Sequence, residues 1–344
     1  MSETEGKLAG TGAVVGVIGA GAWGTALAQA LARASNGREV LLWAREEALA
    51  QRINATRVND LYLPSAVLDP AVRATSDLAD LADLPVLLAV VPAQFLASVI
   101  HRLPARERDL VLCAKGIEAT SGRLMGEVAA AAAPGSRIAV LSGPTFAHEV
   151  AAGLPTAVTL ACSGGAAQWD RLSPVIASPA FRPYYSDDVI GAEVGGAIKN
   201  VLAIACGVVD GLKLGQNARA ALIARGYAEM LRFGLARGAR AETLSGLCGL
   251  GDLVLTCSST SSRNFSLGLA LGQGQTASEA LAGKNSVAEG AATAPILADL
   301  ARRDGIDMPI VDAVCRLLEG AAPARTVVSD ILSRPLRAEQ EPVG

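Results

Sequence analysis

Lysine is scarce in this chain, and two of its lysines stand where proton chemistry would need them. Of 30 basic residues only five are lysines, and the rest are arginines. Arginine keeps its proton in a protein, whereas the pKa of a lysine can be shifted toward neutrality. Lys199, in the run Gly195-Gly196-Ala-Ile-Lys-Asn, and Lys115, followed by Gly116, are therefore ranked first as proton-transfer candidates.

Lys199 is the stronger of the two. It lies in the first long helical stretch of the second half of the chain, where two domains should meet in a cleft. A lysine ammonium held beside a carbonyl can polarise it and deliver a proton. Gly195 and Gly196 each cost about 1 kcal/mol inside a helix, which is tolerable where the backbone must approach a ligand or another helix closely. The alternative is an ordinary solvated lysine on a helix.

Lys115 and Asp252 accompany it. Lys115 ends a predicted strand, and ligands of parallel sheets lie at the carboxyl ends of the strands; the alternative is a surface lysine. Asp252 follows a glycine-rich turn, Gly249-Leu-Gly251, and could orient Lys199 and accept a hydrogen bond from a substrate hydroxyl. An aspartate there is also a normal helix N-cap, and the two roles are compatible.

Ser262, Arg263 and Asn264 precede a predicted helix at 265–271. A helix start of this composition offers backbone N–H groups, the positive end of the helix dipole and a bidentate guanidinium, which together suit a phosphate. Simple capping by Ser262 is the alternative.

A dinucleotide fingerprint opens the chain. Residues 19–24 read G-A-G-A-W-G, follow a predicted strand at 13–18 and open a predicted helix at 24–35. Gly19 permits the tight turn, Gly21 lets the backbone approach a pyrophosphate, and Gly24 lets helix and strand pack closely. The phosphates would lie at the helix N-terminus, beside Ala22 and Trp23.

The second strand, predicted at 39–43, bears on which dinucleotide binds. A site for NAD usually has Asp or Glu at its end, bonding the ribose 2′-hydroxyl. This chain has Arg45, which could pair with a 2′-phosphate and so favours NADPH. Glu46 and Glu47 follow at once, so a one-residue shift of the strand end would favour NADH.

The elements that must position these residues alternate through the first half of the chain. Further strands are predicted at 86–91, 109–114, 137–141, 156–161 and 181–185, with an alanine-rich helix at 123–133. Such alternation predicts an α/β domain with a doubly wound sheet. From about residue 187 helical periodicity takes over, at 189–209, 218–236, 288–300, 309–318 and 325–333. We therefore expect a disordered extension at 1–12, a nucleotide-binding domain at 13–186, an all-α domain at 187–334 and a flexible tail at 335–344.

Composition excludes several classes of protein. A net charge of −3 gives no reason to expect nucleic acid or an anionic membrane as partner. No run of 18 apolar residues and no signal peptide is recognisable, so we expect a cytoplasmic protein without stable membrane association. Six scattered cysteines and two histidines predict small core residues in a reducing compartment and no metal site.

Seven sequence blocks together resemble the NAD(P)-dependent glycerol-3-phosphate dehydrogenases of bacterial type. They run in the family's order from about residue 13 to 330. The blocks are residues 19–24, 114–116, 142–147 (S-G-P-T-F-A), 195–200, 249–253 (G-L-G-D-L), 262–264 and 287–290 (V-A-E-G). The resemblance implies a Rossmann domain followed by a helical domain. It also implies reversible reduction of dihydroxyacetone phosphate to sn-glycerol 3-phosphate for glycerophospholipid synthesis, in a homodimer.

The resemblance also implies a role for each block. Lys199 becomes the proton donor and acceptor, with Lys115 and Asp252 beside it. Substrate contacts fall to Lys115, Gly143, Thr145, Lys199, Asp252, Ser262, Arg263 and Asn264. Cofactor contacts fall to Gly19, Gly21, Ala22, Trp23, Gly24, Arg45, Lys115, Ala147, Arg263, Val287 and Glu289.

Two other functions remain open from the sequence. A 3-hydroxyacid or 6-phosphogluconate dehydrogenase relative shares the Rossmann domain and a similar lysine helix, but lacks the pair of blocks at 142–146 and 249–253. A nucleotide-sensing module without chemistry would not need both lysines, Asp252 and the phosphate residues. Turnover of dihydroxyacetone phosphate separates these alternatives from the main prediction.

Overall fold

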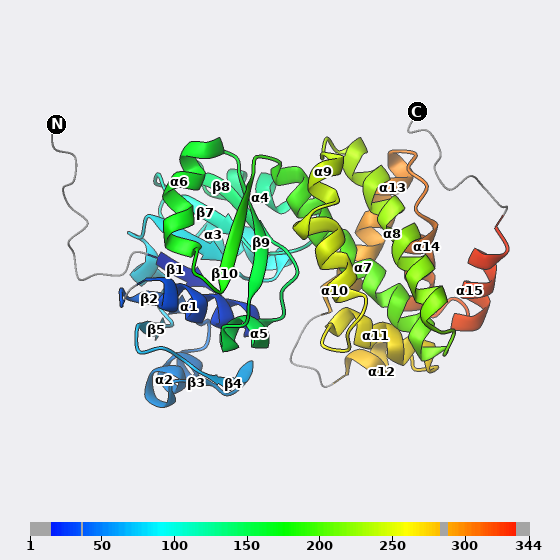
Figure 1. Ribbon diagram of the computed structural model, residues 1–344, viewed down its shortest axis with the longest axis horizontal. Coiled ribbons are helices and arrows are strands. Elements are labelled where there is room, and N and C mark those ends of the chain that lie inside the picture. The colour runs from blue at the N-terminus through cyan, green and yellow to red at the C-terminus, as the bar shows by residue number, and fades with distance from the viewer. Residues whose placement is uncertain (1–14, 36, 283–287, 335–344) are drawn as a thin grey trace.

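The computed structural model describes residues 15–35, 37–282 and 288–334, which form two domains side by side (Figure 1). The predicted extension at 1–12, the predicted tail at 335–344 and Val287 lie outside the described residues. The N-terminal part carries the strands, and helices make up the part that follows residue 188.

An eight-stranded sheet forms the centre of the first domain. Its strand order is β10-β9-β8-β7-β6-β1-β2-β5, so the chain starts in the interior of the sheet and builds outward in both directions. The strands are β1 (Val15–Ile18), β2 (Val40–Trp43), β5 (Val72–Thr75), β6 (Val86–Ala89), β7 (Asp109–Leu112), β8 (Arg137–Ser142), β9 (Thr156–Cys162) and β10 (Phe181–Ser186).

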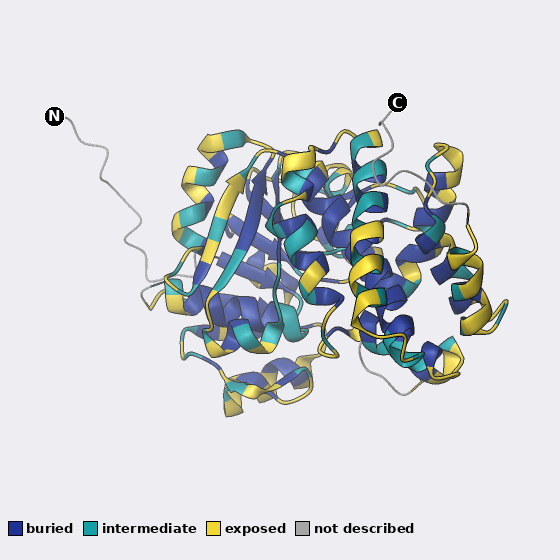
Figure 2. Ribbon diagram, turned by 45° about the vertical axis from the view of Figure 1, so that its right-hand side comes forward, coloured by how far each residue is buried: buried dark blue, intermediate teal, exposed yellow. Residues whose placement is uncertain are grey.

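The central strands are apolar because both faces of the sheet are covered. Every residue of β1, β2, β6 and β7 is buried, and their side chains divide between two apolar clusters, one on each face (Figure 2). One face packs on helices α1 (Ala22–Ala34) and α6 (Gly165–Ile176). The other face includes Ala192 and Cys248, which belong to the helical domain. The two domains therefore share apolar core.

The predicted strands are all present, with ends shifted by a few residues, and the last two, β9 and β10, run opposite to the other six. β9 pairs with β8 in antiparallel register, opposite Val140 at Ala161, whereas every other pair in this sheet is parallel. Alternating buried residues cannot distinguish the two directions, because both give the same period of two.

The segment between β2 and β6 was not assigned from sequence. It contains helix α2 (Glu47–Thr56), a separate hairpin of β3 (Val58–Asn59) and β4 (Leu63–Val67), and the edge strand β5. These strands are short and partly exposed, so they lack a continuous apolar run that would reveal them. The remaining helices of this domain are α3 (Leu96–Ile100), α4 (Met125–Ala132) and α5 (Ala147–Ala152).

Helix α7 (Val189–Gly211) is the axis of the second domain. It is long and apolar enough to cross a membrane by composition, but most of it is buried inside the fold as a core helix. Around it lie α8 (Gln216–Ala236), α9 (Ala241–Leu244), a π-helical turn η3 (Leu247–Gly251), α10 (Asp252–Thr256), α11 (Arg263–Gly272), α12 (Ala277–Leu281), α13 (Glu289–Arg303), α14 (Pro309–Leu318) and α15 (Ala324–Leu332).

Glycines let α7 and α11 approach each other backbone to backbone. A Cβ atom on Gly207 would lie 2.0 Å from the carbonyl oxygen of Phe265, and one on Gly268 would lie 1.9 Å from that of Ile204. Any side chain at these positions would force the helices apart. This contact fixes α11, and with it the predicted phosphate residues at its start, against α7.

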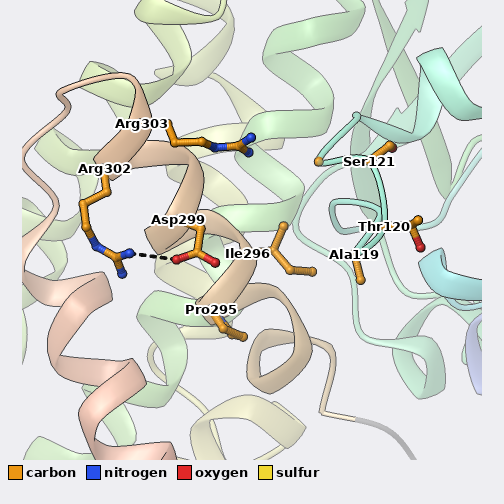
Figure 3. A pocket seen from close by; sticks show the side chains of 9 residues that line it. Ala119, Thr120, Ser121, Pro295, Ile296, Asp299, Arg302 and Arg303 are labelled. Carbon is orange, nitrogen blue, oxygen red and sulfur yellow. Dashed lines mark hydrogen bonds and ion pairs between the residues drawn. The ribbon is translucent and has the colours of Figure 1, made fainter.

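A pocket of about 700 Å³ opens between the domains, away from the predicted site residues (Figure 3). One wall is the loop Ala119, Thr120, Ser121 and Gly122, and the other is α13, where Arg302 pairs with Asp299 at 2.8 Å. None of the residues predicted to do chemistry lines this pocket.

Candidate active site

Two lysines from different domains meet on one aspartate. Lys199 Nζ lies 2.5 Å from Asp252 Oδ1, and Lys115 Nζ lies 2.8 Å from Asp252 Oδ2. Thr256 completes the cluster, since its Oγ1 accepts a hydrogen bond from Lys199 Nζ at 3.1 Å and donates one to Asp252 Oδ1 at 3.2 Å. The side chain of Asp252 is 0% exposed, that of Lys199 7% and that of Lys115 15%.

Close backbone packing brings these residues together. A Cβ on Gly195 would lie 2.5 Å from the carbonyl oxygen of Cys248, so the absence of a side chain lets η3 and α10 lie directly against α7. A Cβ on Gly196 would lie 3.2 Å from Ser142 Oγ and 3.3 Å from Lys115 Cγ, so this glycine makes room for the ends of β7 and β8. The pair of glycines noted in the sequence thus serves two different neighbours.

The surroundings shift the pKa values of the two lysines in opposite directions. Burial lowers the pKa of Lys199 to about 7; the positive charge of Lys115 acts the same way, and the attraction of Asp252 opposes both. Burial also acts on Lys115, but there the carboxylate of Asp252 prevails and the pKa is raised. At neutral pH Lys199 can therefore gain or lose a proton, while Lys115 stays charged.

Three of the alternative interpretations from sequence are wrong. Lys199 is not a solvated surface lysine, because it is buried and paired. Lys115 is not a surface lysine either. Asp252 is not a helix N-cap: the N-cap of α10 is Gly251, and the predicted glycine-rich turn is itself the helical turn η3 that runs into α10.

The predicted phosphate residues stand at the N-terminus of α11. Ser262 is the N-cap, and its Oγ accepts a hydrogen bond from the N–H of Phe265 at 3.2 Å. Capping and phosphate binding are compatible there. Arg263 is exposed and forms no ion pair or hydrogen bond with any described residue, so its guanidinium is available to a ligand.

Asn264 is held from two sides. Its Nδ2 donates to Asn200 Oδ1 at 3.0 Å, and its Oδ1 accepts from the N–H of Gly290 at 2.9 Å. The amide thus ties α11 to α7 and to the start of α13. The Asn264 side chain therefore holds these three helices together. One N–H of its amide group remains available to a ligand.

Glu289, the first residue of α13, lies near the same cations. Burial raises its pKa, and the positive charges of Arg263, Lys115 and Lys199 oppose that effect. The structure therefore brings Glu289 to the lysine cluster and to Arg263.

The glycine fingerprint has the geometry that a pyrophosphate requires. Gly19 has φ +116°, a conformation that side chains rarely adopt, and a Cβ on Gly24 would lie 1.8 Å from the carbonyl oxygen of Gly19. A Cβ on Gly21 would meet nothing within 4 Å, so the space above it is open to a ligand. Helix α1 starts at Ala22 without a side-chain cap, which leaves its first N–H groups for an anion.

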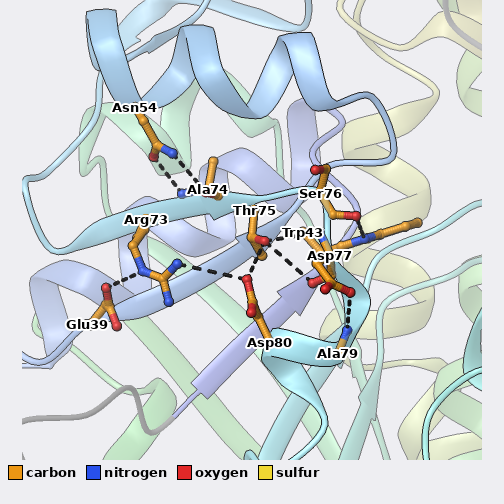
Figure 4. Close-up of polar contacts among 10 residues, drawn as sticks. All are labelled: Glu39, Trp43, Asn54, Arg73, Ala74, Thr75, Ser76, Asp77, Ala79 and Asp80. Atoms are coloured by element: carbon orange, nitrogen blue, oxygen red, sulfur yellow. Dashed lines mark hydrogen bonds and ion pairs between the residues drawn. The ribbon is translucent and has the colours of Figure 1, made fainter.

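Arg45 stands at the carboxyl end of β2, two residues beyond the strand. Its side chain is 78% exposed and lies 2.5 Å from Glu46, the N-cap of α2. A polar network braces the neighbouring edge strand β5 (Figure 4), where Arg73 contacts Glu39 at 2.6 Å and Trp43 Nε1 donates to the carbonyl of Ser76 at 3.0 Å. The strand end beneath Arg45 is thus fixed, while Arg45 itself is solvated.

The turn after β8 fits a close approach of a ligand to backbone. A Cβ on Gly143 would lie 2.9 Å from Val158 Cα, so no side chain is accommodated there. Thr145 is partly buried and donates to the carbonyl of Gly143 at 3.3 Å, and Ala147 begins α5. Ser142 Oγ is buried next to this turn and has no hydrogen-bond partner among the described residues. An unpaired hydroxyl at this place fits a site that is completed by a ligand.

Sequence reasoning missed two polar residues of the site. Thr256 lies one helical turn after Asp252, and this spacing of four residues could have revealed it. Asn200 lies within the sequence block at 195–200, but nothing in the sequence indicated that it would bind Asn264.

The described residues hold no group of three or more potential metal ligands. All six cysteines are free, and five of them are buried.

Both halves of the sequence match one protein family. Residues 14–167 match the family described as NAD-dependent glycerol-3-phosphate dehydrogenase N-terminus, and residues 188–329 match its C-terminus. Residues 168–187 separate the two matches, and the boundary predicted from sequence, between 186 and 187, lies at the end of this interval.

Individual relatives agree with this match. The chain is 70% identical to glycerol-3-phosphate dehydrogenase [NAD(P)+] of Novosphingobium aromaticivorans over 94% of its own length and 98% of the relative's. It is 55% identical to the enzyme of the same description from Caulobacter vibrioides, over 94% and 98% of the two chains. The fold is similar to the crystal structure of glycerol-3-phosphate dehydrogenase from Coxiella burnetii, with a TM-score of 0.89, 41% identity and coverage of 94% and 100%.

Proposed function

We propose, from the premise that this chain belongs to the NAD-dependent glycerol-3-phosphate dehydrogenase family, a division of labour among its site residues. The protein is an NAD(P)-dependent oxidoreductase that interconverts sn-glycerol 3-phosphate and dihydroxyacetone phosphate. What its own residues contribute to that reaction follows from the cluster of Lys199, Lys115 and Asp252.

One observation carries the assignment. A buried lysine whose pKa lies near 7 is joined through one carboxylate to a second lysine that stays charged. Reducing a ketone requires a proton at the oxygen, and oxidising the alcohol requires its removal. Lys199 can serve in both directions near neutral pH, because neither of its protonation states is strongly disfavoured there.

Lys199 Nζ holds the proton that is exchanged with the C2 oxygen of the substrate. Asp252 keeps the amine in place and limits how far burial lowers its pKa. Thr256 accepts from the same amine, which fixes its direction. Lys115 supplies a permanent positive charge beside it, which stabilises negative charge that develops on the carbonyl oxygen.

The substrate phosphate binds at the start of α11. The N–H groups of the first turn, the Ser262 side chain and the free guanidinium of Arg263 provide donors and positive charge. Asn264 holds this helix start against α7, so the phosphate site lies at a fixed separation from Lys199. Gly143 and Thr145 bind the substrate from the other domain.

The nucleotide is held along the carboxyl ends of the strands of the first domain. Gly19, Gly21, Ala22, Trp23 and Gly24 hold the pyrophosphate at the N-terminus of α1. The far end of the nucleotide contacts Lys115, Ala147, Arg263, Val287 and Glu289. When bound, the nicotinamide supplies or accepts the hydride at C2 of the substrate.

Three further features belong to the proposal. Arg45 pairs with a 2′-phosphate and makes NADPH the preferred cofactor over NADH. The enzyme works in the cytoplasm as a homodimer without stable membrane association. Its product, a phosphorylated glycerol, feeds glycerophospholipid synthesis.

The direct test is nicotinamide absorbance with dihydroxyacetone phosphate and each cofactor in turn. Oxidation of NADPH faster than NADH at equal concentration is expected. No turnover with either cofactor would support a nucleotide-sensing module instead, and turnover of 3-hydroxyacids or 6-phosphogluconate in preference would support the second enzyme class.

A further inference from the structure

A buried glutamate connects the two domains close to Lys199. Glu193 lies on α7, in the helical domain, and is only 7% exposed. Its Oε1 accepts a hydrogen bond from the N–H of Gly126 at 2.6 Å. Gly126 lies in the first turn of α4, in the nucleotide-binding domain, so the carboxyl group occupies the N-terminus of a helix that belongs to the other domain.

The contact between Glu193 and Gly126 leaves little free space. A Cβ on Gly126 would lie 3.0 Å from Glu193 Oε2, so even a methyl group would press on the carboxyl group. Burial raises the pKa of Glu193 to about 8, and the N–H of Gly126 opposes this. In either protonation state one carboxyl oxygen can accept the Gly126 N–H, so the hydrogen bond persists across neutral pH.

The same short stretch of α7 carries the catalytic contacts. Within two turns after Glu193, Gly196 packs against Lys115, and Lys199 binds Asp252. A helix is stiff along its axis, so a shift or rotation of α7 at Glu193 moves Lys199 by a similar amount. Misplacement of a reacting group by about 1 Å can cost on the order of a hundredfold in rate.

We propose that Glu193 is a positioning residue that sets the placement of α7 against the nucleotide-binding domain, and thereby the placement of Lys199 relative to a ketone over the cofactor. The proposal rests on the role of Lys199 proposed above. Glu193 acts through the helix: its partner is the backbone of α4, whereas Lys199 binds Asp252 and Thr256.

The chain offers a matched control in Glu229. This residue, on α8, is also buried, and burial raises its pKa to about 8 as well. Its carboxylate accepts the N–H groups of Ile310 at 2.8 Å and Val311 at 3.3 Å, at the N-terminus of α14. Both glutamates thus accept N–H groups at the start of a helix. Glu229 links two helices of one domain, whereas Glu193 links two domains.

The test compares Glu193→Ala, Glu193→Gln and Glu229→Ala by Tm, kcat and KM for NADPH. Both alanine variants should lower Tm, because each leaves N–H groups of a helix start without their carboxyl partner. Only Glu193→Ala should lower kcat, by roughly 10- to 100-fold, with KM for NADPH within about twofold because most of the proposed nucleotide contacts lie in the first domain and are untouched. Glu193→Gln should restore most of kcat, since its amide oxygen can accept the same N–H.

Wild-type kcat in Glu193→Ala, or an equal loss of kcat in Glu229→Ala, overturns the proposal. If Glu193→Ala does not fold, Gly126→Ala decides: its methyl group presses on the carboxyl group, which must give by a few tenths of an ångström, and kcat should fall with little change in KM for NADPH. An unchanged kcat in that variant also overturns the proposal. Lys199→Ala is assayed alongside. If Lys199→Ala keeps the wild-type kcat, the proposed role of Lys199 fails. If Lys199→Ala loses kcat while Glu193→Ala keeps it, only the positioning role of Glu193 is refuted.

Discussion

Two ion pairs in this protein have the same length and opposite surroundings. Lys199 lies 2.5 Å from Asp252, and Arg45 lies 2.5 Å from Glu46. The side chains of the first pair are 7% and 0% exposed, and those of the second are 78% and 46% exposed. The first pair joins α7 to α10 at the domain junction, and the second lies between neighbours in sequence on the surface.

The difference shows that distance alone does not determine what an ion pair does. In the buried pair, loss of hydration is the largest influence on Lys199 and lowers its pKa to about 7. In the exposed pair, water solvates both charges, and Arg45 remains charged and free to exchange partners. A buried pair is suited to moving a proton, and an exposed pair is suited to binding an anion.

The largest expected effect comes from removing the buried amine. Lys199→Ala should lower kcat by roughly 10²- to 10⁴-fold, the usual contribution of a positioned acid–base group. It should also lower Tm, because Asp252 loses one of its two buried cationic partners. Cofactor affinity, measured by quenching of protein fluorescence, should stay nearly unchanged, and a fall in kcat of less than tenfold would show that another group supplies the proton.

Removal of the free guanidinium should have the next largest effect. Arg263→Ala should lower kcat/KM for dihydroxyacetone phosphate by roughly 10- to 150-fold, since a charge-assisted hydrogen bond contributes about 1.5–3 kcal/mol. Both KM and kcat should change, because the phosphate also positions C2. NADPH affinity is measured separately, since Arg263 is also assigned a cofactor contact.

Unphosphorylated dihydroxyacetone is the matched substrate for that experiment. It should be very poor for the wild type and should differ little between wild type and Arg263→Ala. If the wild type reduces it nearly as well as its phosphate, the phosphate site is not at Arg263.

The pKa of the buried amine predicts a pH dependence with a definite sign. Reduction needs the protonated form of Lys199, and the protonated fraction falls about tenfold per pH unit above the pKa. The rate of reduction should therefore decline as pH rises above about 7, and the rate of glycerol 3-phosphate oxidation should rise through the same range. Initial rates in both directions from pH 6 to 9 test this, and a profile of reduction that is flat to pH 9 would contradict it.

The smallest effect is expected at the exposed pair. Arg45→Asp should shift the ratio of kcat/KM for NADPH over NADH toward NADH, by less than about tenfold because the site is solvated. Glu46→Gln should shift the ratio the other way, since it releases Arg45 from its present partner. Neither change should alter Tm appreciably, and an unchanged cofactor ratio in both variants would assign the preference to another residue.

Much of the fold could be predicted because buried positions appear in the sequence as periodic apolar residues. The seven strands predicted from apolar runs are present, and so are the five later helical stretches. The hairpin of β3 and β4 was not found, because Leu63 is the only fully buried residue of β4 and no apolar run marks it. The reversed direction of β9 and β10 depends on how the chain returns to the sheet, which no local pattern encodes.

The sequence by itself identified the candidates for the chemistry: the glycine fingerprint, the two lysines, Asp252 and the residues at the start of α11. Local composition suffices for this, because each chemical task needs particular residue types next to particular turns. Only the tertiary structure decided what state those residues adopt. Lys115 and Lys199 are distant in the chain, and their shared contact with one buried carboxylate exists only when the domains pack together. Burial and charge in that junction separate the pKa values of the two lysines, since desolvation and Coulomb attraction depend on neighbours in space.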